Sequence, residues 1–308
     1  MSFQPVEGWG QLPPGLDLVE VSGIGVDSQD WVYVFNRGSQ PVVLFDGRGN
    51  YLGPWAPGAF KRPHSLFITA AGEVYCVDDG GHAVYRMDRE GNKELSLEMG
   101  PSDTGFIPGD YFSVRYGGPP FNQPTDVAVA PTGEIYVTDG YGNARVHKFS
   151  STGEHLLSWG GPGEGKGQFR LPHGICIDGE GLVYVADREN SRIQIFDPEG
   201  NYLTQWSSIR RPNQLRIGPD GLFYVAELGY VFTFQRSGAD FSAPRARVTV
   251  RDRQGRILAS VEEEDPYWAP HGLALDSQGH LYVGSVNRSF SRRTAPEDTV
   301  ILRKYQPL

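Results

Sequence analysis

An internal repeat of about 40 residues runs through the 308-residue chain and constrains its fold more than any other feature. The clearest copy contains four apolar segments, at residues 173–178, 181–187, 192–197 and 200–206, separated by turns that are polar or contain glycine. The first segments of the successive copies begin near Ile24, His64, Thr125, His173, Asn213 and His271. We therefore expect six copies of one four-stranded unit.

A four-stranded unit of this length, repeated several times, is typical of a β-propeller. Each unit has two apolar faces that only neighbouring units can cover, so we expect an all-β, six-bladed propeller forming one domain over residues 1–308. Two long gaps between copies predict insertions near residues 100–120 and 236–265. The last copy ends after a third strand, and residues 5–10 resemble the fourth strands of other copies. The N-terminal strand is therefore expected to complete the last blade and close the ring.

The composition agrees with a strand-and-turn fold and excludes several classes of function. The 40 glycines and 23 prolines disfavour a helical fold, and the net charge of −9 disfavours nucleic acid and anionic membranes as partners. No apolar run reaches the roughly 18 residues of a membrane-spanning helix. Two cysteines, both in apolar strand-like segments, form no disulfide framework, and the N-terminus lacks the pattern of a secretory signal. We expect a cytoplasmic monomer that acts on a small molecule or a peptide terminus.

Three histidines stand out because of their positions in the repeat. In a propeller, the starts of the first strands surround the central channel. His64, His173 and His271 occupy these starts in the second, fourth and sixth copies, and each follows a proline. Alternate blades of a six-fold ring lie about 120° apart, so three neutral imidazoles would surround one point and leave a coordination position open, as in catalytic zinc sites. The alternative is a structural relic of the repeat, but the other three copies carry isoleucine, threonine and asparagine.

The turns between the second and third strands lie on the same face as these histidines. Arg37, Tyr141 and Arg188 are at variable tips of such turns, where the fold does not require them. A tyrosine near a divalent cation can serve as a base, and an arginine can hold a carboxylate with two hydrogen bonds. Other polar residues of these turns, such as Asp139 and Asp187, are expected to cap the hairpins.

These features resemble one family in particular. Residues 121–129 and 136–145, Leu171-Pro172-His173 and residues 185–194 are similar to the peptidyl-α-hydroxyglycine α-amidating lyases, six-bladed propellers built from NHL-type repeats. The resemblance implies a zinc ion held by His64, His173 and His271, Tyr141 as the base, and Arg37 and Arg188 as further site residues. It also implies a reaction that cleaves a carbinolamide, R-CO-NH-CH(OH)-COOH, into an amide and glyoxylate.

The chain departs from this family at several positions. The family's structural calcium ion is bound by two backbone carbonyl groups, which match Ile24 and Leu66, and by an aspartate that is replaced here by Gly272. Because a calcium site needs charged oxygen ligands, calcium is the less well supported of the two metals. Ala269 replaces a methionine of the pocket wall. Cysteines of the secreted relatives are replaced, for example by Gly142 and Ile195, as expected in a reducing compartment.

Two other functions remain open from the sequence. The first is a different metal-dependent propeller enzyme, such as a lactonase-type hydrolase or a hydratase, although three imidazoles are softer ligands than the calcium of such hydrolases prefers. The second is a non-catalytic propeller that binds a peptide or protein on one face.

Overall fold

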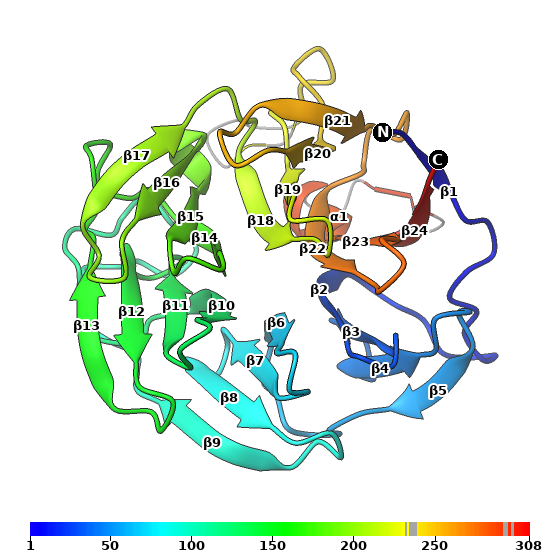
Figure 1. Cartoon of the computed structure of the whole chain (residues 1–308), viewed down its shortest axis with the longest axis horizontal. Coiled ribbons are helices and arrows are strands. Elements are labelled where there is room, and N and C mark those ends of the chain that lie inside the picture. Colours follow the sequence, from blue (N-terminus) through cyan, green and yellow to red (C-terminus); the bar gives the residue numbers. More distant parts are fainter. Residues whose placement is uncertain (232, 234–238, 292–294, 297–298) are drawn as a thin grey trace. The chain divides into compact units, whose positions relative to one another are not determined.

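The computed structural model describes residues 1–231, 233, 239–291, 295–296 and 299–308. The strands of these residues form six antiparallel sheets of four strands each, which confirms the predicted all-β, six-bladed propeller (Figure 1). A short helix, α1 (Asn287–Ser291), and a 3₁₀ turn at Arg188–Asn190 are also present. Among the residues described, no helix has the length and apolar character required to cross a membrane.

The chain separates into two compact units. The middle unit, Gly58–Pro212, contains the second, third and fourth blades. Their strands, in sheet order, are β6 (Pro63–Ile68), β7 (Val74–Asp78), β8 (Ala83–Met87) and β9 (Lys93–Glu98); β10 (Pro124–Val129), β11 (Ile135–Asp139), β12 (Arg145–Phe149) and β13 (His155–Trp159); and β14 (Pro172–Ile177), β15 (Val183–Asp187), β16 (Arg192–Phe196) and β17 (Tyr202–Trp206). The strands of the fourth blade match the four segments predicted from the clearest repeat.

The other unit, Met1–Pro57 with Asn213–Leu308, contains the first, fifth and sixth blades. Their strands are β2 (Val21–Val26), β3 (Val32–Asn36), β4 (Val42–Phe45) and β5 (Tyr51–Pro54); β18 (Pro212–Ile217), β19 (Phe223–Glu227), β20 (Arg247–Arg251) and β21 (Ile257–Val261); and β22 (Pro270–Leu275), β23 (Leu281–Ser285), β24 (Leu302–Pro307) and β1 (Phe3–Pro5). That residues 1–308 fold as one domain stays a prediction.

Burial changes systematically across each blade. All five residues of β15 are buried, whereas only one of the five residues of β17, at the outer edge of the same sheet, is buried. Neighbouring sheets cover both faces of an inner strand: Val146 of β12 and Ile175 of β14, for example, belong to one apolar cluster shared by the third and fourth blades. The sequences of the inner strands are therefore nearly continuous runs of apolar residues, as expected for strands that are covered on both faces.

The N-terminal strand completes the last sheet, as predicted, but it lies earlier in the chain than expected. β1 pairs antiparallel with β24, with Phe3 opposite Pro307 and Pro5 opposite Tyr305. The expected strand at residues 5–10 instead contributes Trp9, whose ring packs 5.3 Å from that of Phe45 and 5.0 Å from that of Tyr282. Trp9, which was expected at the end of a strand, therefore packs against aromatic rings of the first and sixth blades instead.

The first strands share one irregularity, which determines where their second residue lies. The pairing of β6 with β7 shifts register between Pro63 and Ser65, and β14 shifts in the same way between Pro172 and Gly174. A bulge of this kind leaves one residue out of the ladder and redirects its side chain. The redirected residues in these two strands are His64 and His173.

The same register corrects the prediction for the first blade. β2 begins at Val21 and shifts register between Val21 and Gly23, so its second residue is Ser22. Ile24, predicted to begin this strand, is its fourth residue. The prediction was wrong by two residues because β2 lacks the proline that precedes the equivalent residue in the other blades.

The structure also relocates the second insertion. Residues 236–265 were expected to be an insertion, but β20 and β21 lie within this range and form the outer half of the fifth blade. The added residues are 228–246, between β19 and β20, and residues 232 and 234–238 of this segment lie outside the described residues. The spacing of the repeats revealed added length but not its position within the blade.

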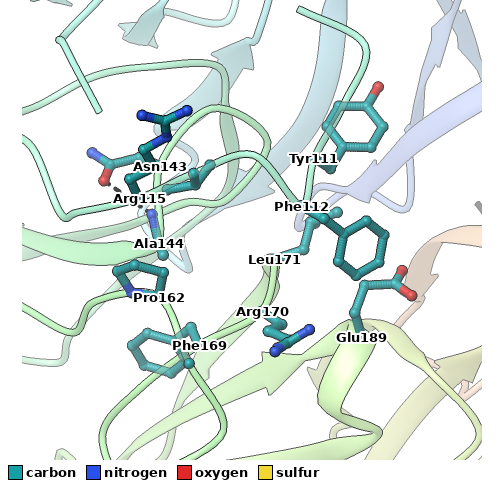
Figure 2. A pocket seen from close by; sticks show the side chains of 12 residues that line it. Tyr111, Phe112, Arg115, Asn143, Ala144, Pro162, Phe169, Arg170, Leu171 and Glu189 are labelled. Carbon is teal, nitrogen blue, oxygen red and sulfur yellow. Dashed lines mark hydrogen bonds between the residues drawn. The ribbon is translucent and has the colours of Figure 1, made fainter. Parts of the chain in front are cut away.

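The first insertion occupies the predicted place, between β9 and β10, and forms one wall of a pocket. Tyr111 and Phe112 from the insertion surround this pocket together with Pro162 and Phe169 from the connection between β13 and β14 (Figure 2). Both walls belong to the middle unit.

Candidate metal centre

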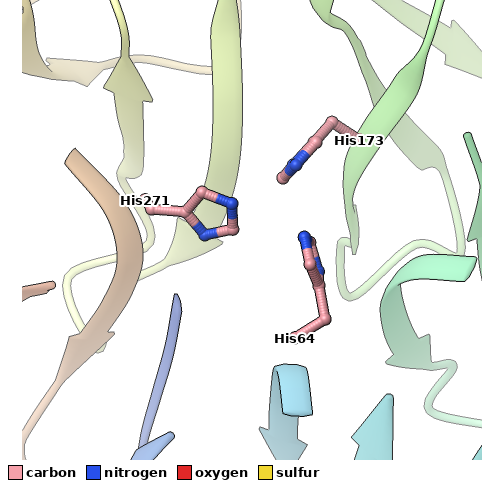
Figure 3. A group of neighbouring side chains, drawn as sticks. All are labelled: His64, His173 and His271. Carbon is pink, nitrogen blue, oxygen red and sulfur yellow. The ribbon is translucent and has the colours of Figure 1, made fainter. Parts of the chain in front are cut away.

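His64 and His173 lie at the bulges of β6 and β14, and both side chains are buried, with 0% and 2% of their surface exposed. Their rings approach each other, with centroids 5.0 Å apart, and a ring nitrogen of one lies within 4.8 Å of a ring nitrogen of the other (Figure 3). The structure therefore brings these two predicted metal ligands of the middle unit together.

The backbone fixes the tautomer of His64. Its Nδ1 lies 2.6 Å from the carbonyl oxygen of Thr125, the second residue of β10. A carbonyl oxygen can only accept a hydrogen bond, so Nδ1 carries the proton and Nε2 of the neutral imidazole presents its lone pair. Metal-binding histidines commonly have this arrangement, because the hydrogen bond from the nitrogen that does not bind the metal orients the ring.

Tyr141 lies between the two imidazoles. Its hydroxyl oxygen is 3.0 Å from Nε2 of His64 and 3.0 Å from Nε2 of His173, and its ring meets both imidazoles edge to face. Only 5% of the tyrosine is exposed. Two ring nitrogens from different blades thus converge on one hydroxyl group, which places the predicted base beside two predicted metal ligands.

The turn after β11 holds Tyr141 in this position. The buried carboxylate of Asp139 accepts hydrogen bonds from the Asn122 backbone amide at 3.0 and 2.9 Å and from Nδ2 of Asn143 at 2.9 Å. The carboxylate therefore fastens both sides of the turn, as its predicted capping role requires. On its outer side the Tyr141 ring packs against Tyr111, with centroids 4.9 Å apart.

Arg188 is fully buried in the turn after β15, next to this tyrosine. The carbon of its guanidinium group lies 5.8 Å from the centroid of the Tyr141 ring. Its Nε donates to Oε1 of Glu189 at 2.8 Å, and Arg211 donates to the same carboxylate at 2.8 Å. Arg188 was predicted at this site from the sequence, whereas Glu189 and Arg211 were not.

Glu189 is charged although it is buried. Burial raises the pKa of this carboxyl group, but the Arg188 and Arg211 guanidinium groups outweigh that effect and hold the pKa below its ordinary value. The Arg188 and Arg211 guanidinium groups thus share the Glu189 carboxylate. A buried arginine beside Tyr141 can bind an anionic group of a ligand.

His271 and Arg37 belong to the other unit. His271, the second residue of β22, is 2% exposed, and its Nδ1 lies 2.6 Å from the carbonyl oxygen of Ser22. Arg37 donates from Nη1 to Glu20 at 2.9 Å and to Ser289 at 2.8 Å. Its backbone amide donates to the Glu20 carbonyl oxygen at 3.0 Å, an arrangement that Arg188 repeats with Leu171 at 3.3 Å. The two arginines therefore hold the same position in their respective blades.

A calcium ion bound by the backbone carbonyl groups of Ile24 and Leu66 stays a prediction. Both residues are buried, and each is the fourth residue of a first strand. A Cβ atom added at Gly272 would lie 2.9 Å from Cα of Gly23 and 3.0 Å from the Ile24 amide nitrogen, so a side chain here would require the backbone to shift. Gly272 itself supplies no carboxylate, the charged ligand that calcium prefers.

Comparison with known proteins agrees with the repeat pattern. Residues 121–149 and 169–196 match the NHL repeat. The chain is 31% identical to mouse (Mus musculus) NHL repeat-containing protein 3, over 89% of this chain and 78% of that protein. It is 33% identical to peptidyl-alpha-hydroxyglycine alpha-amidating lyase 1 of Drosophila melanogaster, over 62% of this chain and 34% of that protein.

This chain is also similar to parts of longer proteins. Peptidyl-glycine alpha-amidating monooxygenase A of Xenopus laevis is 28% identical over 92% of this chain, which spans about a third (32%) of that protein's length. Among solved structures, a streptogramin B lyase matches 99% of this chain and 97% of its own, with a TM-score of 0.63 and 12% identity. At that identity the match concerns the fold alone.

The chain is therefore similar to proteins named as amidating lyases, and its similarity to NHL repeat-containing protein 3 extends over most of both proteins. The chain belongs to the NHL-repeat β-propeller family.

Proposed function

We propose that this protein is a zinc-dependent carbon–nitrogen lyase that cleaves a carbinolamide of the α-hydroxyglycine type into an amide and glyoxylate. The observation that carries the proposal is the position of the Tyr141 hydroxyl group, 3.0 Å from Nε2 of both His64 and His173. A phenol between two buried imidazoles of this kind has no evident structural purpose in the repeat. The similarity to proteins named as amidating lyases supports the same reaction.

The donor set fits a zinc ion. His64 is a neutral imidazole with Nδ1 bound to a carbonyl group, and its Nε2 converges with that of His173, as zinc ligands do. We propose His271 as the third ligand. Its Nδ1 is bound to the carbonyl oxygen of Ser22, the second residue of β2, just as His64 is bound to that of Thr125, the second residue of β10.

A zinc ion at these ligands would act as a Lewis acid toward the oxygen of a bound substrate. Tyr141 is proposed to accept the proton of the substrate hydroxyl group. As the carbonyl group of glyoxylate forms, the C–N bond breaks and its electron pair remains on nitrogen. Tyr141 then returns the proton to that nitrogen, so that the amide leaves neutral and no other reactant is needed.

Arg188 is proposed to hold the substrate carboxylate. It is fully buried beside Tyr141, and a guanidinium group can hold a carboxylate with two parallel hydrogen bonds. Fixing the carboxylate orients the adjacent carbon, which bears both the hydroxyl group and the nitrogen, relative to Tyr141. Arg37, at the equivalent place in the first blade, is proposed as a second arginine of the site.

The test is glyoxylate release from an N-acyl-α-hydroxyglycine by the purified protein. The proposal predicts equal amounts of glyoxylate and amide, well above the spontaneous rate. Tyr141→Phe should abolish the excess, because the variant keeps the ring but cannot carry the proton. Glyoxylate formation at the spontaneous rate by the zinc-loaded wild type would overturn the proposal.

A further inference from the structure

A pocket of about 290 Å³ lies in the middle unit beside the candidate site. One wall comes from the insertion between β9 and β10, with Phe112 and Val114, and another from the connection between β13 and β14, with Pro162 and Phe169 (Figure 2). Its volume is at the lower end of small-molecule pockets, which begin at about 300 Å³. It is large enough for one side chain but not for a folded partner.

Hydrogen bonds fasten the insertion to the third blade. Thr104 Oγ1 donates to the Gly142 carbonyl oxygen at 2.5 Å, and the Gly118 amide donates to Oδ1 of Asn143 at 3.1 Å. Both acceptors are in the turn that carries Tyr141. The wall is therefore built onto the turn, and a ligand would meet it already formed, which lowers the entropic cost of binding.

Two residues that line the pocket contact residues of the candidate site. The Tyr111 ring packs 4.9 Å from the Tyr141 ring, and Glu189 receives the hydrogen bond from Arg188 at 2.8 Å. A molecule whose reacting carbon lies at Tyr141 and whose carboxylate lies at Arg188 would thus have this pocket within reach of its remaining end.

Much of the pocket wall is carbon surface, and two arginines, Arg115 and Arg170, also line it. Phe112, Val114, Pro162, Phe169 and Leu171 contribute this carbon surface. The one acidic group on the wall, Glu189, already receives hydrogen bonds from Arg188 and Arg211. The carbon surface can therefore hold an aromatic or aliphatic group, and an arginine side chain can also pack against an aromatic ring.

We propose that this pocket binds the side chain adjacent to the amide that the reaction releases, and that it selects an aromatic or large aliphatic side chain there. This inference rests on the proposed lyase function. According to this inference, the insertion between β9 and β10, which the fold itself does not require, determines substrate specificity. Filling such a pocket changes kcat/KM by about ten- to two-hundredfold.

The first test compares two substrates, N-acetyl-phenylalanyl-α-hydroxyglycine and N-acetyl-glycyl-α-hydroxyglycine. The wild type should release glyoxylate from the phenylalanyl substrate with a kcat/KM at least about tenfold higher. Val114→Trp, which fills the pocket, should remove this preference and leave the glycyl substrate unaffected. Tyr116→Trp introduces the same side chain at an exposed position of the same insertion and should keep the preference. Equal kcat/KM for both substrates in the wild type would overturn the inference while the lyase function stands.

A second test does not depend on turnover. Titration calorimetry with the product analogue N-acetylphenylalaninamide should detect binding to the wild type and to Tyr116→Trp, and at least about tenfold weaker binding to Val114→Trp. Phe112→Ala, which removes part of one wall, should also weaken binding. It replaces Val114→Trp as the test of the pocket if Val114→Trp does not fold. Binding without glyoxylate release would contradict the proposed reaction but support the pocket. Binding that both pocket variants leave unchanged would refute the pocket.

Discussion

Nδ1 of His64 lies 2.6 Å from the carbonyl oxygen of Thr125, the residue at the same strand position in the following blade. His271 makes the same contact with Ser22, again at 2.6 Å. Both histidines are thus oriented by the backbone of the next first strand, and this backbone is present whatever side chain the neighbouring blade carries. The repeat therefore orients a histidine in one blade without requiring a histidine in the next, which explains how histidines can alternate with other residues.

Tyr141→Phe should separate metal binding from turnover. The substitution removes the hydroxyl group near Nε2 of His64 and His173 but keeps the ring that packs against Tyr111. Since general acid–base catalysis contributes about 10²- to 10⁴-fold, kcat should fall by at least about a hundredfold while zinc content stays equal to that of the wild type. Steady-state glyoxylate assays and metal analysis measure the two quantities. A kcat within a few-fold of the wild type would exclude Tyr141 as the base.

Arg188→Lys should weaken substrate binding more than it slows the chemical step. A lysine retains the charge but cannot grip a carboxylate with two parallel hydrogen bonds, so we expect KM to rise by about tenfold or more. Arg256→Lys is the matched control, because the Arg256 side chain is 76% exposed and does not line the pocket. An unchanged KM in Arg188→Lys would show that the carboxylate is bound elsewhere.

Glu189→Gln should lower the free energy of unfolding. The carboxylate, of which 9% is exposed, is the counter-charge of Arg188 and Arg211. Removing one partner of a buried ion pair costs about 3–5 kcal/mol, because the remaining charge is left uncompensated. Glu164→Gln, at a side chain that is 72% exposed, should change stability by less than about 0.5 kcal/mol. Urea unfolding of both variants measures the difference, and equal stabilities would refute the role assigned to Glu189.

The stability of the protein should decrease on acidification below pH 6.5, partly because of His147. Burial lowers the pKa of this histidine, and its hydrogen bond to Asp139 does not fully offset the effect. The unfolded chain, with an ordinary histidine pKa of about 6.5, then binds a proton that the folded protein does not, so stability is full above this pH and is lost as the pH falls below it. His147→Gln should reduce the loss measured by urea unfolding between pH 7.5 and 5.5. An identical loss in the variant would contradict this assignment.

The repeat made much of the fold predictable. Apolar segments that neighbouring blades cover on both faces leave a strong pattern in the sequence, and the prolines before His64 and His173 marked the first strands. Ser22 was missed because no proline precedes it. The added residues of the fifth blade were misplaced because repeat spacing measures length and not the position of a loop.

The candidate site was predictable to the extent that it follows the repeat. Tyr141 and Arg188 were found because each lies at a turn tip where the blade does not require it. Glu189 and Arg211 were missed because their contact depends on how the turn after β15 packs against the residues that precede β18. A buried arginine directly before the proline of a first strand, as in Arg211-Pro212, was the one available signal. The Tyr111 contact depends on the shape of an insertion that no periodicity describes.

The most direct test of the metal centre is the zinc content of protein purified without chelator, for the wild type, His173→Ala and His155→Ala. His155 is exposed in β13, away from the proposed ligands, and serves as the control. The proposal predicts about one zinc ion per chain in the wild type and in His155→Ala, and loss of zinc in His173→Ala. A wild type without zinc, or His173→Ala with its full zinc content, would contradict it.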